Sequence, residues 1–187
     1  GIPPLREALA ADVGGARGLD YGANNVSIQP GGKPTIGKYI AAMMEHGETV
    51  LYPNPGYPIY ESQIEFFGGV AHPYGYVDTK EGLRLDFDAV EAGIAAGARH
   101  LFYNNYNNPT GASSPSAEME RLAQLTVEHD LFVVSDEAYF DILFDGVPRS
   151  IASLPGMRER TLILYTFSKK FAMTGWRLGG AIGPRWL

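Results

Sequence analysis

Cysteine is absent from the 187 residues of this chain. Without a thiol, the chain can form neither a disulfide framework nor a thiolate metal site. The sequence also lacks a cluster of basic residues and an apolar run long enough to span a bilayer. Its 15 basic and 21 acidic residues leave a net charge of −6, which argues against a nucleic-acid or membrane partner. We therefore expect a cytoplasmic protein that acts on small molecules and holds no metal.

The composition that remains is that of a folded domain. Hydrophobic residues make up 45% of the chain and charged residues 19%, a balance that excludes a disordered protein. The length suits one well-buried domain. Neither end resembles a natural terminus, because the chain begins at Gly1 without methionine and stops after two bulky apolar residues, Trp186 and Leu187. We expect a fragment of a longer protein.

Short β-rich runs alternate with longer helical patterns, which is typical of a parallel α/β sheet. Seven strands are predicted, at residues 25–29, 49–52, 70–74, 100–103, 131–135, 161–166 and 178–182. Five helices are predicted between them, at residues 4–12, 35–45, 57–67, 88–95 and 116–129. The loop before the last strand shows no helix pattern, and a parallel crossover usually needs a helix. The last strand is therefore predicted to be antiparallel to its neighbours.

The segment from Thr166 to Gly179 gathers an amine, small hydroxyls and a guanidinium among glycines. A lysine amine can form a Schiff base with an aldehyde cofactor, and hydroxyls with an arginine suit a phosphate. Lys169 lies eight positions before Arg177. The planar fork of an arginine pairs well with a dianion, so Arg177, Thr166 and Ser168 are the candidate phosphate ligands.

Three further motifs lie beside predicted strands or helices. Asp136 directly follows the strand 131–135, at the end where open α/β sheets bind ligands, although a helix cap is an alternative role. Asn108 precedes Pro-Thr-Gly beyond another strand, where an ordinary turn is the alternative. The glycine turn 30–35 opens a predicted helix, and amides at a helix N-terminus can bind an anion, although a plain turn is the alternative.

Taken together and in this order, the motifs resemble those of the class I/II aminotransferases, the fold-type-I enzymes that use pyridoxal 5′-phosphate (PLP). The resemblance implies that residues 1–187 form the PLP-binding large domain of such an enzyme. It implies an α/β fold with a mostly parallel seven-stranded sheet, helices on both faces and an antiparallel last strand. It also implies a homodimer, and it leaves the family's N-terminal arm and C-terminal small domain outside this chain.

The same resemblance gives each motif residue a role. Lys169 would form the Schiff base with PLP and act as base for the substrate's α-proton. Lys170 is the rival for this role, but it lacks the eight-residue offset to Arg177. Asp136 would pair with the pyridine nitrogen. We expect Lys169, Asp136 and Tyr139 to be the catalytic residues.

The remaining roles concern the cofactor's ring and phosphate. Tyr139 and Asn108 would hydrogen-bond its phenolic oxygen, and Tyr57 would stack on its ring, with a core tyrosine as the alternative for Tyr57. Backbone amides at Gly32 and Lys33 would add donors to the phosphate.

The function that the resemblance implies is transfer of an amino group between an L-amino acid and a 2-oxo acid. A PLP-dependent C–S lyase, or related carbanion chemistry on the same fold, is one alternative. An aminotransferase-like effector domain of a transcription regulator is another. We expect the chain by itself to be inactive, because the family binds the substrate carboxylate through its C-terminal small domain.

Overall fold

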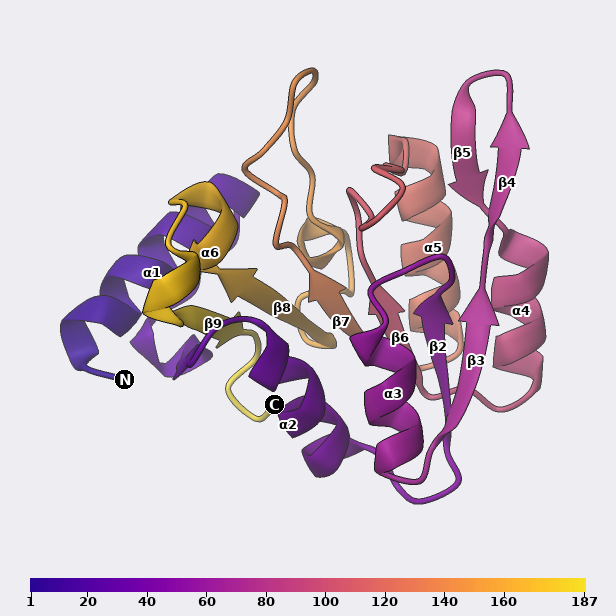
Figure 1. Ribbon diagram of the computed structural model, residues 1–187, viewed down its shortest axis with the longest axis horizontal. Coiled ribbons are helices and arrows are strands. Elements are labelled where there is room, and N and C mark those ends of the chain that lie inside the picture. The colour runs from indigo at the N-terminus through magenta and orange to yellow at the C-terminus, as the bar shows by residue number, and fades with distance from the viewer.

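The computed structural model describes every residue from Gly1 to Leu187 and centres on a seven-stranded sheet (Figure 1). The strands, in sheet order, are β1 Val26–Gln29, β9 Gly179–Ile182, β8 Thr161–Thr166, β7 Phe132–Asp136, β6 His100–Tyr103, β2 Thr49–Pro53 and β3 Val70–Tyr74. From β8 to β3 each neighbouring pair is parallel, whereas β9 is antiparallel to both β1 and β8. The predicted α/β fold with its antiparallel last strand is confirmed.

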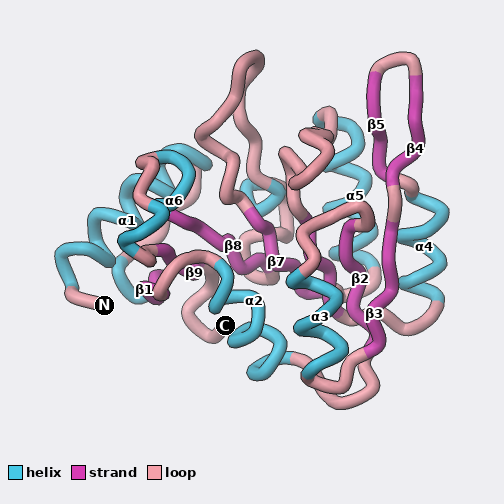
Figure 2. The backbone as a smooth tube through the Cα atoms, viewed as in Figure 1, coloured by secondary structure: helices cyan, strands magenta, loops and turns pink.

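Helices cover both faces of the sheet (Figure 2). The longer helices are α1 Pro3–Arg17, α2 Lys33–Met43, α3 Ile59–Phe66, α4 Phe87–Ala95 and α5 Ser116–Glu128. Successive strand residues point to opposite faces. In β7, Val133 therefore packs in the core under α4 and α5, and Val134 packs in the core under α2 and α3. None of the helices is both long and apolar enough to cross a membrane.

Strand β8 lies inside the sheet, between β9 and β7, and carries the continuous apolar run Leu162–Tyr165. All six of its residues are buried. Leu162 and Leu164 pack with α2 and α3, while Ile163 and Tyr165 pack with α1 on the opposite face. Because both faces of β8 are covered, neither can carry the polar residues of a solvated sheet face.

Helix α1 extends beyond its predicted end at residue 12 and continues to Arg17. The pair Gly14–Gly15 looks like a stop signal, but both glycines are helical. A side chain on Gly14 would lie 2.5 Å from the carbonyl oxygen of Leu19, so this glycine permits a close approach of the chain. The helix stops at Gly18, which adopts the left-handed conformation with φ 66°. The added turn carries Arg17 into the buried interior.

Two segments that project from the sheet were not predicted from the sequence (Figure 2). One is a hairpin of β4 Tyr76–Thr79 and β5 Gly82–Leu85, which forms a separate two-stranded sheet. The other is the loop that follows β7. A one-turn helix, α6 Phe167–Lys170, also lies in the segment expected to contain no helix. Each of these elements is too short for a periodic apolar pattern to reveal it.

The helices start within two residues of the predicted positions. Helix α5 begins at Ser116 as predicted, but its N-cap position is Pro115, which makes no capping hydrogen bond. Helix α3 begins at Ile59, so Tyr57 precedes the helix. Helix α4 begins after Asp86, whose carboxylate accepts a hydrogen bond from the Ala89 N–H at 3.1 Å.

Candidate active site

The carboxyl ends of β8, β7 and β6 meet at one edge of the sheet and line a cavity of about 260 Å³. Thr166 ends β8, Asp136 ends β7, and Asn104 follows β6. Ligands of open α/β sheets bind at this edge. The ten residues predicted for the site all line the cavity: Gly32, Lys33, Tyr57, Asn108, Asp136, Tyr139, Thr166, Ser168, Lys169 and Arg177.

One end of the cavity gathers hydroxyls and a guanidinium. The Thr166 hydroxyl caps α6 by accepting a hydrogen bond from the Ser168 N–H at 3.2 Å. Arg177 places Nη1 3.4 Å from the Ser168 hydroxyl and donates to the Thr174 carbonyl at 2.8 Å. Arg177 has a left-handed backbone, with φ 49°, directly after a short 3-10 turn. A guanidinium beside two hydroxyls is a donor set suited to a phosphate.

The start of α2 completes this end of the cavity. Gly31 has φ 93°, and a Cβ atom there would collide with the guanidinium of Arg177. A Cβ atom on Gly32 would lie 2.8 Å from Leu164 and 3.4 Å from Thr166. Only glycines allow the backbone to approach β8 and Arg177 this closely. The free amides at the N-terminus of α2 therefore lie beside the guanidinium and can share an anion with it.

A buried carboxylate lies deeper in the cavity. Asp136 Oδ2 accepts a hydrogen bond from the Tyr60 hydroxyl at 2.7 Å, and Oδ1 accepts one from the Ala138 N–H at 3.1 Å. Burial raises the pKa of Asp136, and the two hydrogen bonds oppose that rise. No helix begins at this turn, so Asp136 is not a helix cap. A carboxylate in this setting favours a cationic partner in the cavity.

Two residues that the sequence did not single out support these ligands. Tyr60 is completely buried and bonds the side chain of Asp136. Asn104 donates to the Asp136 carbonyl at 2.9 Å and accepts from the Asn108 N–H at 3.0 Å. Asn104 thus connects the end of β7 to the loop that carries Asn108. Its position directly after a strand was the available signal, but two nearby asparagines obscured it.

The adjacent lysines have different surroundings. Lys169 lines the cavity, and its Nζ lies 5.3 Å from the centre of the Tyr139 ring. Lys170 Nζ instead lies 3.1 Å from Asp12 Oδ2 on α1 and 3.4 Å from Asp141 Oδ1 on the loop after β7. These two carboxylates hold Lys170 outside the cavity, so that of the two adjacent lysines only Lys169 lines it.

The remaining walls are aromatic and amide groups. Tyr57 is half-buried and packs edge-on against Tyr60, with 5.8 Å between the ring centres. Asn108 and Tyr139 line the cavity from the loops after β6 and β7. The cavity therefore offers an anion-binding end, a buried carboxylate, an aromatic side chain and a primary amine. This donor set fits PLP, which carries a phosphate, a pyridine nitrogen, a flat ring and an aldehyde.

Similarity to known proteins extends over the whole chain. The family model described as aminotransferase class I and II matches residues 1–187. The chain is 39% identical to aromatic-amino-acid aminotransferase 2 of Thermococcus litoralis, over 100% of this chain and 48% of that protein. It is 38% identical to the aspartate/prephenate aminotransferase of Thermus thermophilus, over 99% of this chain and 47% of that protein.

A solved structure has the same fold. The structure of N-succinyldiaminopimelate aminotransferase from Mycobacterium tuberculosis matches with a TM-score of 0.95 at 32% identity, over 100% of this chain and 49% of that chain. The chain thus spans about half the length of the curated relatives that it matches.

Proposed function

This chain belongs to the class I and II aminotransferase family, and from that premise we propose that residues 1–187 are the PLP-binding large domain of an aminotransferase. The observation that carries the proposal is the cavity in which Lys169 and Arg177, from the segment between β8 and β9, meet Asp136 from the end of β7. An amine, a buried carboxylate and a guanidinium together match the three polar ends of PLP. Transfer of an amino group between an L-amino acid and a 2-oxo acid is proposed for the full-length protein.

When bound, PLP would supply an aldehyde for an amine and a ring that withdraws electrons from the substrate's α-carbon. The residues that would hold it are those that line the cavity: Thr166, Ser168, Arg177 and the amides of Gly32 and Lys33 for the phosphate, Asp136 for the ring nitrogen, Asn108 and Tyr139 for the phenolic oxygen, and Tyr57 for the ring face.

The proton chemistry in this proposal belongs to two side chains. Asp136 keeps a proton on the ring nitrogen, because a positive nitrogen compensates the buried carboxylate. The ε-amine of Lys169 would hold the cofactor at its aldehyde, and the same amine would move the proton of the substrate's α-carbon. Lys170 cannot substitute, since its ammonium is paired with Asp12 and Asp141.

Assembly as a homodimer and a cytoplasmic location are part of the same proposal. Large apolar side chains that lie exposed, such as Phe66 and Trp176, support a covering partner. Analytical ultracentrifugation of the full-length protein would test the dimer, and cell fractionation would test the location.

The reaction is tested with the full-length protein, 2-oxoglutarate and a panel of amino acids. The panel should include aromatic amino acids and aspartate, because similar proteins are named for them. We expect amino transfer that Lys169→Ala lowers by at least about 10²-fold, the usual contribution of a positioned acid or base. Ammonia and pyruvate released from a cysteine conjugate would indicate the lyase alternative instead. A full-length protein that neither binds PLP nor transfers amino groups would refute the proposal.

A further inference from the structure

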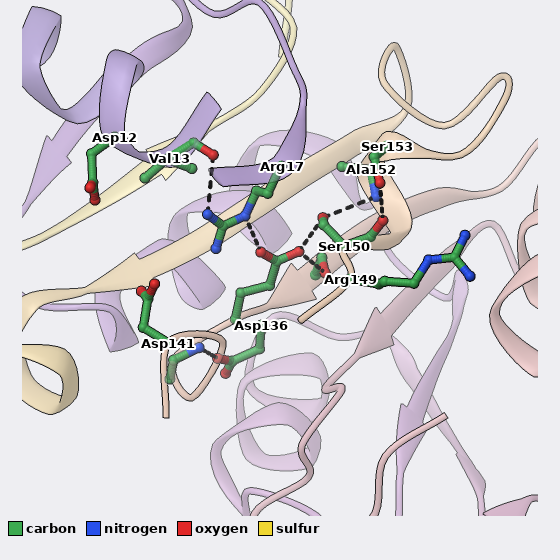
Figure 3. Close-up of polar contacts among 12 residues, drawn as sticks. Asp12, Val13, Arg17, Asp136, Asp141, Arg149, Ser150, Ala152 and Ser153 are labelled. Carbon is green, nitrogen blue, oxygen red and sulfur yellow. Dashed lines mark hydrogen bonds and ion pairs between the residues drawn. The ribbon is translucent and has the colours of Figure 1, made fainter. Parts of the chain in front are cut away.

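A buried ion pair lies behind the cavity and joins it to a helix that does not line it. The Nε of Arg17, the last residue of α1, donates to Glu137 Oε2 at 2.5 Å, and the two side chains are only 1% and 2% exposed. Figure 3 shows the Arg17 guanidinium extending from α1 toward the segment that begins at Asp136. Burying two charges is costly even when they pair, so this ion pair is weak evidence for stability alone.

Both oxygens of the Glu137 carboxylate accept hydrogen bonds. Its Oε1 accepts from the Ser135 hydroxyl at 2.9 Å and from the Ser150 hydroxyl at 2.5 Å, while Oε2 accepts from Arg17. The Glu137 N–H donates to the Leu164 carbonyl of β8 at 3.1 Å. Glu137 is therefore fixed at both its backbone and its side chain, one residue after Asp136.

The guanidinium of Arg17 contacts the same segment a second time. Its central carbon lies 3.7 Å from the centre of the Phe140 ring, and Nη1 donates to the Val13 carbonyl at 3.1 Å. A cation over an aromatic face is favourable, more so when desolvated. One side chain of α1 thus holds the segment at residues 137 and 140. The cavity-lining Asp136 and Tyr139 each lie next to one of these points.

We propose that Arg17 and Glu137 are positioning residues, which fix the segment Asp136–Phe140 so that Asp136 and Tyr139 face the cofactor. The inference rests on the proposed function. The positive charge of Arg17 also compensates the negative charge of Glu137. Without that compensation, the adjacent carboxylates of Asp136 and Glu137 would repel each other, and one of them would take up a proton. Asp136 is then the only net anion of the segment, as a partner of a cationic ring nitrogen should be.

The test compares two matched substitutions in the full-length holoenzyme. Glu137→Gln removes the charge from the pair while keeping the side chain's shape. Glu48→Gln makes the same change at the amino end of the sheet, where Glu48 bonds His100 at 3.2 Å. The readouts are the dissociation constant of PLP and the pH midpoint of the bound cofactor's absorbance band. We expect Glu137→Gln to weaken PLP binding at least about ten-fold and to shift the midpoint, and Glu48→Gln to change neither.

A double variant, Arg17→Met with Glu137→Gln, separates positioning from folding. Replacing both members leaves no unpaired buried charge, which is the costly outcome of removing one partner alone, so we expect the double variant to fold even where a single substitution fails. We expect its PLP binding to remain weakened and its midpoint shifted, because α1 no longer holds the segment. A double variant with wild-type affinity and midpoint would overturn the proposal.

Hydrogen exchange distinguishes a failure of the positioning role from a failure of the proposed function. If the wild-type protein binds no PLP, the proposed function fails, and amide exchange in residues 136–140 then decides the positioning role without the cofactor. We expect faster exchange in the double variant than in wild type, and no change there in Glu48→Gln. Equal exchange in the double variant and wild type would refute the positioning role.

Discussion

Asp136 is the residue at which stability and the proposed function conflict most directly. Its carboxylate is buried, and burial raises its pKa. The folded protein therefore binds this proton more tightly than the unfolded chain does, so stability falls as the pH rises from the ordinary aspartate pKa through the raised one. A cationic cofactor nitrogen would compensate the charge, so the proposed ligand removes a cost that the cofactor-free protein bears.

We predict that Asp136→Asn stabilises the cofactor-free full-length protein while weakening its PLP binding. The gain in the free energy of unfolding should be larger at pH 8 than at pH 4, because the carboxylate is charged at the higher pH. PLP affinity should fall about 10- to 100-fold, the effect of losing a hydrogen bond to a charged group. Urea unfolding at both pH values and PLP titration measure the two effects. Unchanged affinity would contradict the role given to Asp136.

For the candidate site, the sequence predicted ten residues that line one cavity, because most of them lie in short motifs that follow the carboxyl end of a strand. Their roles toward a ligand remain predictions. The sequence could not predict the residues that hold those side chains. Tyr60 and Asn104 are ordinary residue types, and only the packing of α3 and the end of β6 brings them to Asp136. Arg17 is 120 positions away from Glu137 in the chain, and no local pattern links the two.

Among the elements, the start of α2 allows the most specific test, through a comparison of two glycines. Gly31 and Gly47 have similar left-handed backbones, with φ 93° and 87°, so a side chain strains both. Only at Gly31 would the added methyl group meet Arg177, whereas nothing lies within 4 Å of the Cβ position on Gly47. Substitutions at the two positions therefore distinguish the effect of backbone strain from the effect of disturbing the proposed anion site.

We predict that Gly31→Ala and Gly47→Ala both lower the free energy of unfolding, by about 1 kcal/mol. Only Gly31→Ala should also weaken the binding of PLP, and of inorganic phosphate to the cofactor-free protein, because its methyl group displaces the guanidinium of Arg177. Denaturant unfolding and isothermal titration calorimetry provide the measurements. Equal phosphate affinity in the two variants would show that the start of α2 does not bind the anion.

The ends of the elements were predicted less well than their existence. Helix α1 continues through Gly14, because the chain turns back after the helix so that Leu19 lies against Gly14, where only a glycine fits, and the low helix propensity of glycine does not stop the helix. The hairpin β4–β5 was missed, although Gly82 with φ 101° marks its turn. Its two strands are short, and they pair with each other away from the main sheet, where no burial pattern identifies them.

For the molecule as a whole, the alternation of strands and helices sufficed to predict the fold class, because a parallel sheet needs helices on both faces. The strand order was beyond prediction, since β1 lies at the edge next to β9, the last strand of the chain. That pairing depends on the antiparallel return of β9 and on the packing of α1 against β1, both of which are long-range events.

The whole fold also has a predictable acid sensitivity at the edge of the sheet opposite the cavity. His100 is buried at the start of β6, where Nδ1 lies 2.9 Å from the Tyr39 hydroxyl and Nε2 lies 3.2 Å from Glu48 Oε2. Burial lowers the pKa of His100, Glu48 opposes this shift, and Arg99 adds to it. Protonation therefore favours the unfolded chain, and stability falls as the pH drops below the ordinary histidine pKa.

We predict that His100→Gln flattens this pH dependence. Between pH 7 and pH 5, one titrating group can change the free energy of unfolding by at most about 1.4 kcal/mol per pH unit. The slope should decrease in His100→Gln and persist in Tyr39→Phe, which removes a hydrogen bond but retains the imidazole. Urea unfolding across this range measures the slope. An identical slope in wild type and His100→Gln would assign the acid sensitivity to other groups.

The central claim is that Lys169, and not its neighbour, is the amine that holds PLP. Borohydride treatment of the full-length protein loaded with PLP, followed by peptide mass spectrometry, tests it most directly. We predict a single reduced phosphopyridoxyl group on Lys169, because Lys170 is held outside the cavity by Asp12 and Asp141. A label on Lys170, or no label on a protein that binds PLP, would contradict the account.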